Sequence, residues 1–121
     1  MIDANKLKPQ NQAKMNEFEK AKVFSFVSEV DYAIGAIVSK NVLKKDTGNI
    51  SLFAFDKGET LSTHTAPFDA TVQVLDGKAK ITIGESQIYL NAGDSVIMPA
   101  RIPHSVEAIE KFKMLLTMIK G

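Results

Sequence analysis

HTAPFDATVQVLDGKAKITIGESQIYLNAGDSVIMPARIPH, residues 64–104, is the stretch that decides the fold. Short runs that alternate apolar and polar residues are separated here by clusters of Gly, Asp, Asn and Pro. Alternation with a period of two predicts strands with one buried face, because successive side chains point to opposite faces. The Asp76-Gly77 pair between two such runs predicts a hairpin with a type I′ turn, which needs positive φ at both central residues. Many short strands at nearly even spacing indicate an all-β sandwich or barrel.

The same rhythm continues on both sides of this stretch. Residues 33–39 and 50–55 predict two earlier strands. The C-terminal run 112–120, FKMLLTMIK, has apolar residues at both helical and strand spacing. Its β-favouring residues and its all-β surroundings favour a strand. Residues 1–22 are predicted to be a polar lead-in, either a short helix over residues 15–22 or irregular, and residues 23–121 to form the barrel domain.

Composition narrows the class of protein. The chain has 121 residues, of which 45% are hydrophobic and 24% charged, which suits one globular domain. A net charge of +1, with lysines spread among acids, predicts no nucleic-acid partner. The absence of cysteine excludes disulfides, thiolate metal sites and cysteine nucleophiles. No apolar run approaches the roughly 20 residues that span a bilayer, so we expect no membrane partner, no secretory signal and a cytoplasmic location.

Two segments resemble the paired motifs of the cupin family, G-x5-H-x-H-x3,4-E-x6-G and G-x5-P-x-G-x2-H-x3-N. Six residues match at the right spacing: Gly58, His64 and Gly77 in the first motif, and Gly93, Pro99 and His104 in the second. The chain is therefore similar to small single-domain bacterial cupins, the cupin 2 conserved barrel type, many of which have no assigned activity. The resemblance implies a jelly-roll β-barrel of two antiparallel sheets, here with a short N-terminal extension.

The departures from the motifs affect the metal site. Metal-binding cupins usually use three histidines and a glutamate, but here the second histidine position is Ala66 and the glutamate position is Ala70. The glycine of the second motif is replaced by Arg101, and its final asparagine by Ala108. The resemblance therefore implies incomplete metal-binding motifs.

The two histidines that remain, His64 and His104, are mapped by the resemblance to one interior. As metal ligands they are too few, because a catalytic divalent site normally takes three protein ligands plus water. Met98 offers a thioether, which suits copper better than zinc or manganese. Asp69 is close enough in sequence to orient His64, but strand alternation places its side chain on the face opposite Ala70.

These observations lead to a pocket hypothesis with open alternatives. We expect a small organic molecule in the barrel, held without a full metal site, because two imidazoles in an apolar pocket are typical of small-molecule sites. The alternative is a metal-dependent oxygenase, decarboxylase or isomerase with a divalent transition metal on the two histidines; a third is a structural role. No catalytic residue or firm cofactor is identified. The candidate pocket residues are His64, His104, Met98, Ala66, Ala70, Val72 and Ile102.

A homodimer is also expected. The apolar run 23–27, VFSFV, and the aromatic residues Phe53 and Phe55 are the candidate surface for a second copy of the chain.

Overall fold

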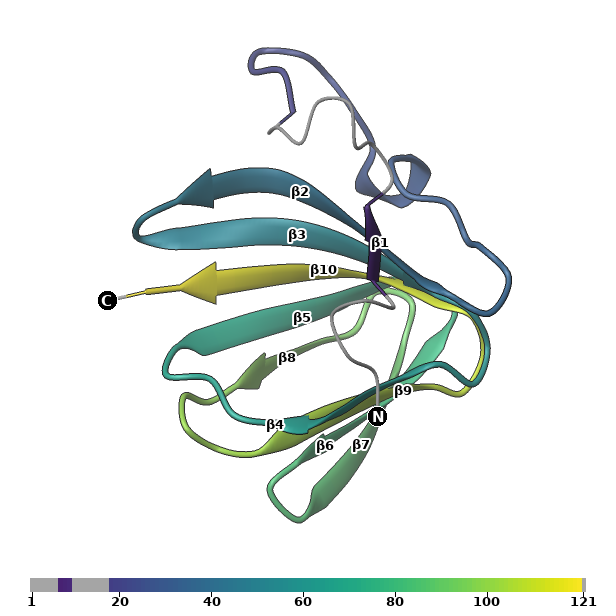
Figure 1. Cartoon of the computed structure of the whole chain (residues 1–121), viewed down its shortest axis with the longest axis vertical. Coiled ribbons are helices and arrows are strands. Elements are labelled where there is room, and N and C mark those ends of the chain that lie inside the picture. The colour runs from purple at the N-terminus through teal and green to yellow at the C-terminus, as the bar shows by residue number, and fades with distance from the viewer. Residues whose placement is uncertain (1–6, 10–17, 121) are drawn as a thin grey trace.

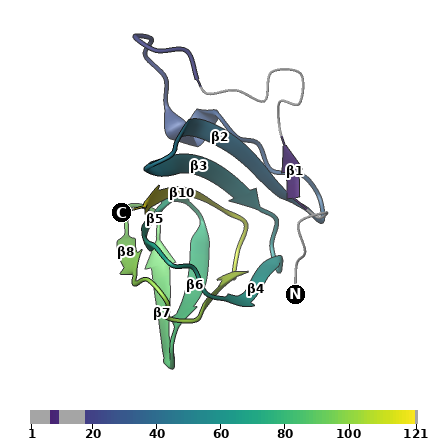
Figure 2. The same ribbon diagram turned by 60° about the vertical axis from the view of Figure 1, so that its left-hand side comes forward.

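The computed structural model describes residues 7–9 and 18–120 and shows two β-sheets packed face to face (Figures 1 and 2). In chain order the elements are β1 (Leu7–Pro9), the short 3-10 helix η2 (Phe26–Ser28), β2 (Ile37–Lys45), β3 (Gly48–Phe55), β4 (Thr60–His64), β5 (Asp69–Asp76), β6 (Lys78–Ile83), β7 (Ser86–Asn91), β8 (Ser95–Met98), β9 (His104–Ala108) and β10 (Phe112–Ile119). Within these residues no helix has the length and apolar character needed to cross a bilayer.

The strand order is that of a jelly roll. The larger sheet has the order β1-β2-β3-β10-β5-β8, and the smaller sheet has the order β4-β9-β6-β7. All neighbouring strands are antiparallel except β1 and β2, which pair in parallel. The last strand, β10, lies inside the larger sheet between β3 and β5. The predicted all-β jelly-roll barrel is therefore confirmed, and so is the strand over the C-terminal run.

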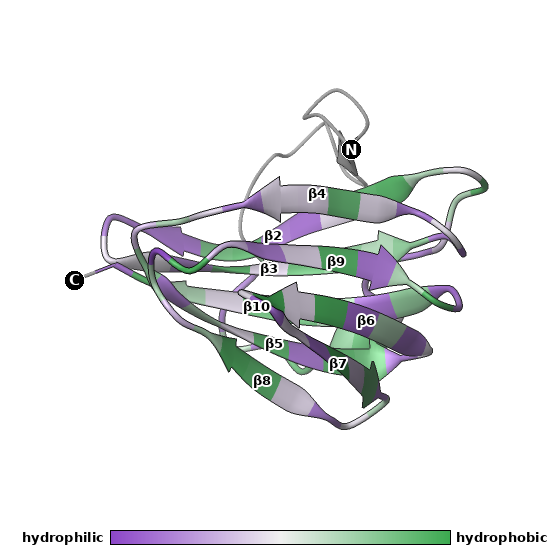
Figure 3. Cartoon of the chain, turned by 90° about the horizontal axis from the view of Figure 1, so that it is seen from below, coloured by the Kyte–Doolittle hydropathy of each residue, from purple (hydrophilic) through white to green (hydrophobic). Residues whose placement is uncertain are grey.

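Alternation along the strands explains where the core lies. In β5 the side chains of Ala70, Val72 and Val74 are buried, whereas the residues between them are exposed. The hydropathy colours of Figure 3 show the same banding along several strands. Phe55 and Phe112 stack with their ring centroids 4.5 Å apart at the centre of the enclosed core. Both rings are fully buried, so they contribute to the apolar stabilisation of the core.

Residues 18–36, which we call the arm, lie outside the barrel. Figure 1 shows the arm rising beyond the β2 edge of the larger sheet. Val30 of the arm is fully buried in a second apolar cluster with residues of β2 and β3. Polar contacts fix the arm further: the Tyr32 hydroxyl donates to an Asp76 carboxylate oxygen at 2.5 Å, and the Lys113 ammonium donates to the Val27 carbonyl at 2.6 Å. The arm is thus anchored to the outer face of the larger sheet.

The predicted hairpin at Asp76-Gly77 is wrong. The strands on either side, β5 and β6, belong to different sheets, so the chain crosses between sheets at this pair. Gly77 has φ +79°, but Asp76 does not have the positive φ that a type I′ turn requires. Gly77 is needed because a β-carbon there would collide with the backbone carbonyl of Lys111. A two-residue hairpin does join β6 and β7, at Gly84-Glu85.

Other boundaries near the N-terminus also differ from expectation. Residues 33–39 do not form one strand, because a turn at Ile34-Gly35 delays the start of β2 until Ile37. Of the residues predicted to form a short helix, those before residue 18 lie outside the described part of the chain, and residues 18–22 contain no helix. The strand β1 falls within the predicted polar lead-in.

The expected dimer surface needs one correction. Phe55 is fully buried in the barrel core, and Phe53 packs against the same core, so Phe55 cannot contact a second copy. Val23 is fully exposed, and Phe24 and Val27 are partly exposed. The apolar run of the arm therefore stays available, and the homodimer stays a prediction.

Candidate functional site

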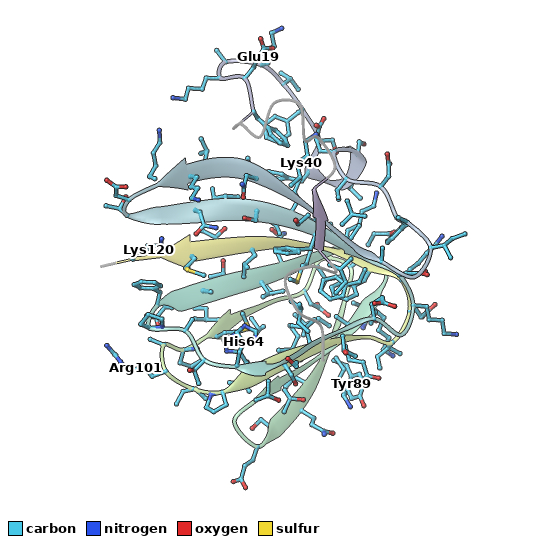
Figure 4. All side chains as sticks on the ribbon, in the orientation of Figure 1. Glu19, Lys40, His64, Tyr89, Arg101 and Lys120 are labelled. Carbon is cyan, nitrogen blue, oxygen red and sulfur yellow. The ribbon has the colours of Figure 1, made fainter. Side chains whose placement is uncertain are left out.

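The two histidines lie side by side on neighbouring strands. His64 ends β4 and His104 begins β9, and the antiparallel register pairs them directly. Their Nε2 atoms are 3.1 Å apart, and their rings meet edge to face with centroids 4.3 Å apart. In Figure 4 the labelled His64 lies between the two sheets. Residues forty positions apart in the chain thus share one location in the barrel.

Backbone carbonyls fix which nitrogen of each ring carries hydrogen. Nδ1 of His64 is 2.8 Å from the Ser62 carbonyl oxygen, and Nδ1 of His104 is 3.1 Å from the Ile102 carbonyl oxygen. A carbonyl oxygen can only accept, so each Nδ1 must donate its hydrogen there. In the neutral rings both Nε2 atoms are then acceptors, and two acceptors facing each other cannot form a hydrogen bond. The pair therefore suits a donor, or a cation, placed between the two Nε2 atoms.

Burial favours the neutral form of His104. The side chain is largely inaccessible to water, and this desolvation lowers the pKa of His104 below its ordinary value of 6.5. The hydrogen bond to the Ile102 carbonyl acts in the opposite direction, and the nearby His64 ring adds a smaller lowering effect. At neutral pH this imidazole is therefore an acceptor at Nε2.

A cavity of about 60 Å³ adjoins the two rings. Its surroundings are apolar except for the imidazoles. The lining residues are Leu61, His64, Ala66, Phe68, Ala70, Met98, His104, Val106, Met114, Leu116 and Met118. The lining draws on both sheets and on the loop between β4 and β5, so the cavity lies between the sheets at the end of the barrel where this loop runs.

The larger sheet presents methionines toward this end of the cavity. Ala70 of β5 is paired with Met98 of β8 on one side and with Met118 of β10 on the other. All three residues line the cavity. Met114 lines it too, but it is paired with Val74 and so lies further along the sheet from the histidines. The histidines of one sheet and the two thioethers that flank Ala70 are therefore gathered around the same space.

The structure brings together five of the seven predicted pocket residues: His64, His104, Met98, Ala66 and Ala70. Val72 and Ile102 do not line the cavity. Val72 shares the inward face of β5 with Ala70 but is fully buried in the core. Ile102 is 39% exposed and lies in the loop before β9.

Several lining residues were not predicted, and a usable signal existed for some of them. Phe112, Met114, Leu116 and Met118 occupy alternate positions of β10, so the inward position of Phe112 fixes the direction of the others. Phe68 could not be found in this way, because it lies in a loop that has no periodicity.

The loop between β8 and β9 closes over this end of the barrel by backbone contacts. The Arg101 amide donates to the Ala66 carbonyl at 2.7 Å, and the Ala100 amide donates to a carboxylate oxygen of Asp69 at 2.7 Å. Asp69 is thus engaged with this loop and does not bond to His64, as strand alternation predicted. Arg101 has φ +66°, a left-handed conformation that favours glycine, at the position where the cupin motif has glycine. Figure 4 shows its side chain directed away from the barrel.

The cavity does not fit the usual divalent metal site of metal-binding cupins. Ala66 and Ala70 line it at the positions of the absent histidine and glutamate, and a methyl group has no donor atom. In the described part of the chain no group of three or more His, Cys, Asp or Glu side chains is placed to hold a metal ion. Two imidazoles alone fall short of the three protein ligands that catalytic divalent sites take.

Comparison with known proteins places this fold. The family model described as cupin domain matches residues 51–120. A conserved protein of unknown function from Streptococcus pyogenes is 36% identical, with 88% of this chain and 93% of that chain covered and a TM-score of 0.83. A cupin 2 conserved barrel domain protein from Leptotrichia buccalis is 43% identical, with 80% of this chain and 47% of that chain covered and a TM-score of 0.78.

A cupin superfamily protein from Desulfitobacterium hafniense is 25% identical, with 89% and 99% of the two chains covered and a TM-score of 0.82. Among curated proteins no match was found.

Proposed function

This chain belongs to the cupin family, and from that premise we propose that it binds a small organic molecule in the cavity between its sheets. The apolar walls hold the carbon skeleton of the molecule, and the facing Nε2 atoms of His64 and His104 accept a hydrogen bond from its polar end. The observation that carries the proposal is the pair of acceptors 3.1 Å apart at an otherwise apolar cavity. A few convergent polar groups in an apolar pocket are the usual composition of a small-molecule site.

The hydrogen-bond pattern defines the polar end of the ligand. Both Nδ1 atoms already donate to backbone carbonyls, so neutral rings have only acceptors left. A ligand with a hydroxyl or a protonated carboxyl supplies the missing donor, whereas an ether or a ketone does not. An unmatched buried acceptor costs about 1–3 kcal/mol, so donors are favoured over their donor-free isosteres by a similar amount.

The cavity volume limits the size of the part of the ligand that the cavity can enclose. An engineered cavity of about 150 Å³ accepts benzene. The cavity here, at about 60 Å³, is less than half as large, so it encloses a short aliphatic group better than an aromatic ring. We therefore expect short-chain alcohols or acids, or the short end of a longer molecule.

Methionine methyl groups give a direct test. Three of the five methionines of the chain line the cavity. In protein labelled with ¹³C at the methionine methyls, millimolar 1-butanol should shift the signals of Met98, Met114 and Met118. Methyl propyl ether, which has the size of butanol without the donor, should shift them much less.

Two variants and one outcome make this test specific. His64→Phe keeps a ring at the exposed end of the pair but removes one of the two acceptors, so it should reduce the preference for butanol over the ether to what His104 alone provides. Ala70→Val adds volume inside the lining and should weaken binding of both. Equal responses to butanol and the ether in the unmodified protein, or shifts confined to other methionines, would refute the proposal.

A further inference from the structure

The donor atoms around the cavity form a set that the organic ligand does not explain. At the end where His64 and His104 face each other, the opposite sheet presents Met98 and Met118 on either side of Ala70. All four side chains line the same cavity. Two imidazole nitrogens and two thioether sulfurs are thus gathered there without any carboxylate in the lining.

From this arrangement we infer that the cavity binds a single copper(I) ion, with Nε2 of His64 and His104 and the sulfurs of Met98 and Met118 as ligands. Thioethers are soft donors that select Cu(I) over zinc, manganese and magnesium. The inference goes beyond the proposed organic ligand and does not depend on it, although both occupants would use the same two Nε2 atoms.

The spacing of the imidazoles suits one ion. A metal that binds two nitrogens at about 2.0 Å with a tetrahedral angle holds those nitrogens about 3.3 Å apart. The observed Nε2–Nε2 distance is 3.1 Å, so a small opening of the pair is enough. The rings are also held in the required tautomer, because each Nδ1 donates to a backbone carbonyl and leaves Nε2 free. Such outer hydrogen bonds are the usual way in which ligating histidines are oriented.

The charge of the site favours a monovalent ion. All four proposed ligands are neutral, and the rest of the lining is apolar. The cost of transferring an ion from water to a low-dielectric site grows with the square of its charge, so a divalent ion here costs about four times as much as a monovalent one. Divalent sites offset this cost with carboxylates, and Ala70 stands where such a carboxylate would be. The same substitution that disfavours a divalent metal therefore leaves a site suited to Cu(I).

Anaerobic titration of the full, untagged chain tests this inference. Protein is added to Cu(I) held by the chromophoric chelator bicinchoninate, and loss of colour measures transfer. We expect one Cu(I) per chain. The Met98→Leu/Met118→Leu double variant should lose affinity by about 100-fold, while zinc should compete poorly in the unmodified protein.

Met114→Leu is the matched control. It removes a third thioether from the same lining, but from a position further along the sheet, so its Cu(I) affinity should stay within about threefold of the unmodified value. Circular dichroism checks that each variant is folded. His64→Phe, which changes an exposed side chain, removes one of the proposed nitrogen ligands and should also lower the Cu(I) affinity.

The outcomes separate this inference from the proposed function. No transfer of Cu(I), or equal affinity in the unmodified protein and the double variant, overturns the copper site whatever the organic probes do. If Cu(I) binds as expected, then Cu(I) should also suppress the butanol-induced shifts, because both need the same nitrogens. If butanol causes no methionine shifts in the metal-free protein, this contradicts the proposed organic ligand and leaves the copper site unaffected.

Discussion

Rebuilding the missing donors offers a sharp test of the site geometry. Ala66 and Ala70 line the same cavity as His64 and His104, at the two positions where metal-binding cupins have histidine and glutamate. If the side chains at both positions point into the cavity, the double variant Ala66→His/Ala70→Glu should gain one imidazole and one carboxylate, which with His64 and His104 makes three imidazoles and one carboxylate around one point. Such a set is sufficient for a divalent transition metal.

The expected size of the effect follows from burial. Ala70 is only 7% exposed, so without metal a glutamate there is a buried charge with no partner. Removal of one partner of a buried ion pair costs about 3–5 kcal/mol, and we expect a loss of this order in metal-free double variant. A metal ion that binds only the folded state, at a free concentration 100 times its dissociation constant, should raise the free energy of unfolding by about 2.7 kcal/mol.

Urea denaturation with and without Co²⁺ measures both effects, and the visible spectrum of bound Co²⁺ reports its coordination. The matched control is Thr71→Glu alone, which adds no third imidazole and places its carboxylate outward, because Thr71 is the next residue of β5 after Ala70 and is exposed. This control should show no metal-dependent stabilisation. Equal stabilisation of both variants by Co²⁺, or of neither, would show that the inward direction assigned to residues 66 and 70 is wrong.

Three further predictions concern the backbone and the histidine pair. Arg101→Gly should raise the free energy of unfolding in urea by about 1 kcal/mol by relieving the left-handed φ, whereas an equal gain in Arg101→Ala would rule out this cause. Gly77→Ala should lower the free energy of unfolding by about 2 kcal/mol or more because of the clash with Lys111. The control is Gly58→Ala, where φ is +85° but an added β-carbon meets nothing within 4 Å, so its loss should be much smaller. Similar losses in the two variants would contradict the predicted clash. Because burial lowers the pKa of His104, the unfolded state takes up a proton on this side chain at higher pH than the folded state does. The free energy of unfolding should therefore fall as the pH drops below about 6.5. If His104→Phe has the same dependence of stability on pH between about 7.5 and 5.5 as the unmodified protein, this contribution is refuted.

The barrel could be predicted from the sequence because its signals are local. Alternation predicted the strand at residues 50–55, which lies within β3, and residues 112–120 were predicted to form a strand that agrees with β10 to within one residue. Local signals do not say which strands pair, and this is why Asp76-Gly77 was mistaken for a hairpin. Gly77 is required by the close approach of Lys111, a contact between segments 34 residues apart that no local pattern reveals.

The site was only partly predictable for a similar reason. The motif resemblance located His64 and His104, and alternation gave the inward direction of Ala70 and Val72. Alternation does not tell which of the inward residues border the cavity, so Val72 was included in the predicted pocket and Met118 was left out. The position of Met118 depends on the register of β5 with β8 and β10, which pairs Ala70 with both Met98 and Met118.

The position of β10 has a consequence for biosynthesis. Residues 112–119 form the last of the described strands in chain order, yet they are the link between β3 and β5 and supply Phe112 to the core. Until they emerge, the nascent polypeptide has two open strand edges and an uncovered Phe55, both of which invite aggregation. Folding of the barrel therefore cannot be completed before β10 has been synthesised, and chains truncated before residue 112 should be insoluble.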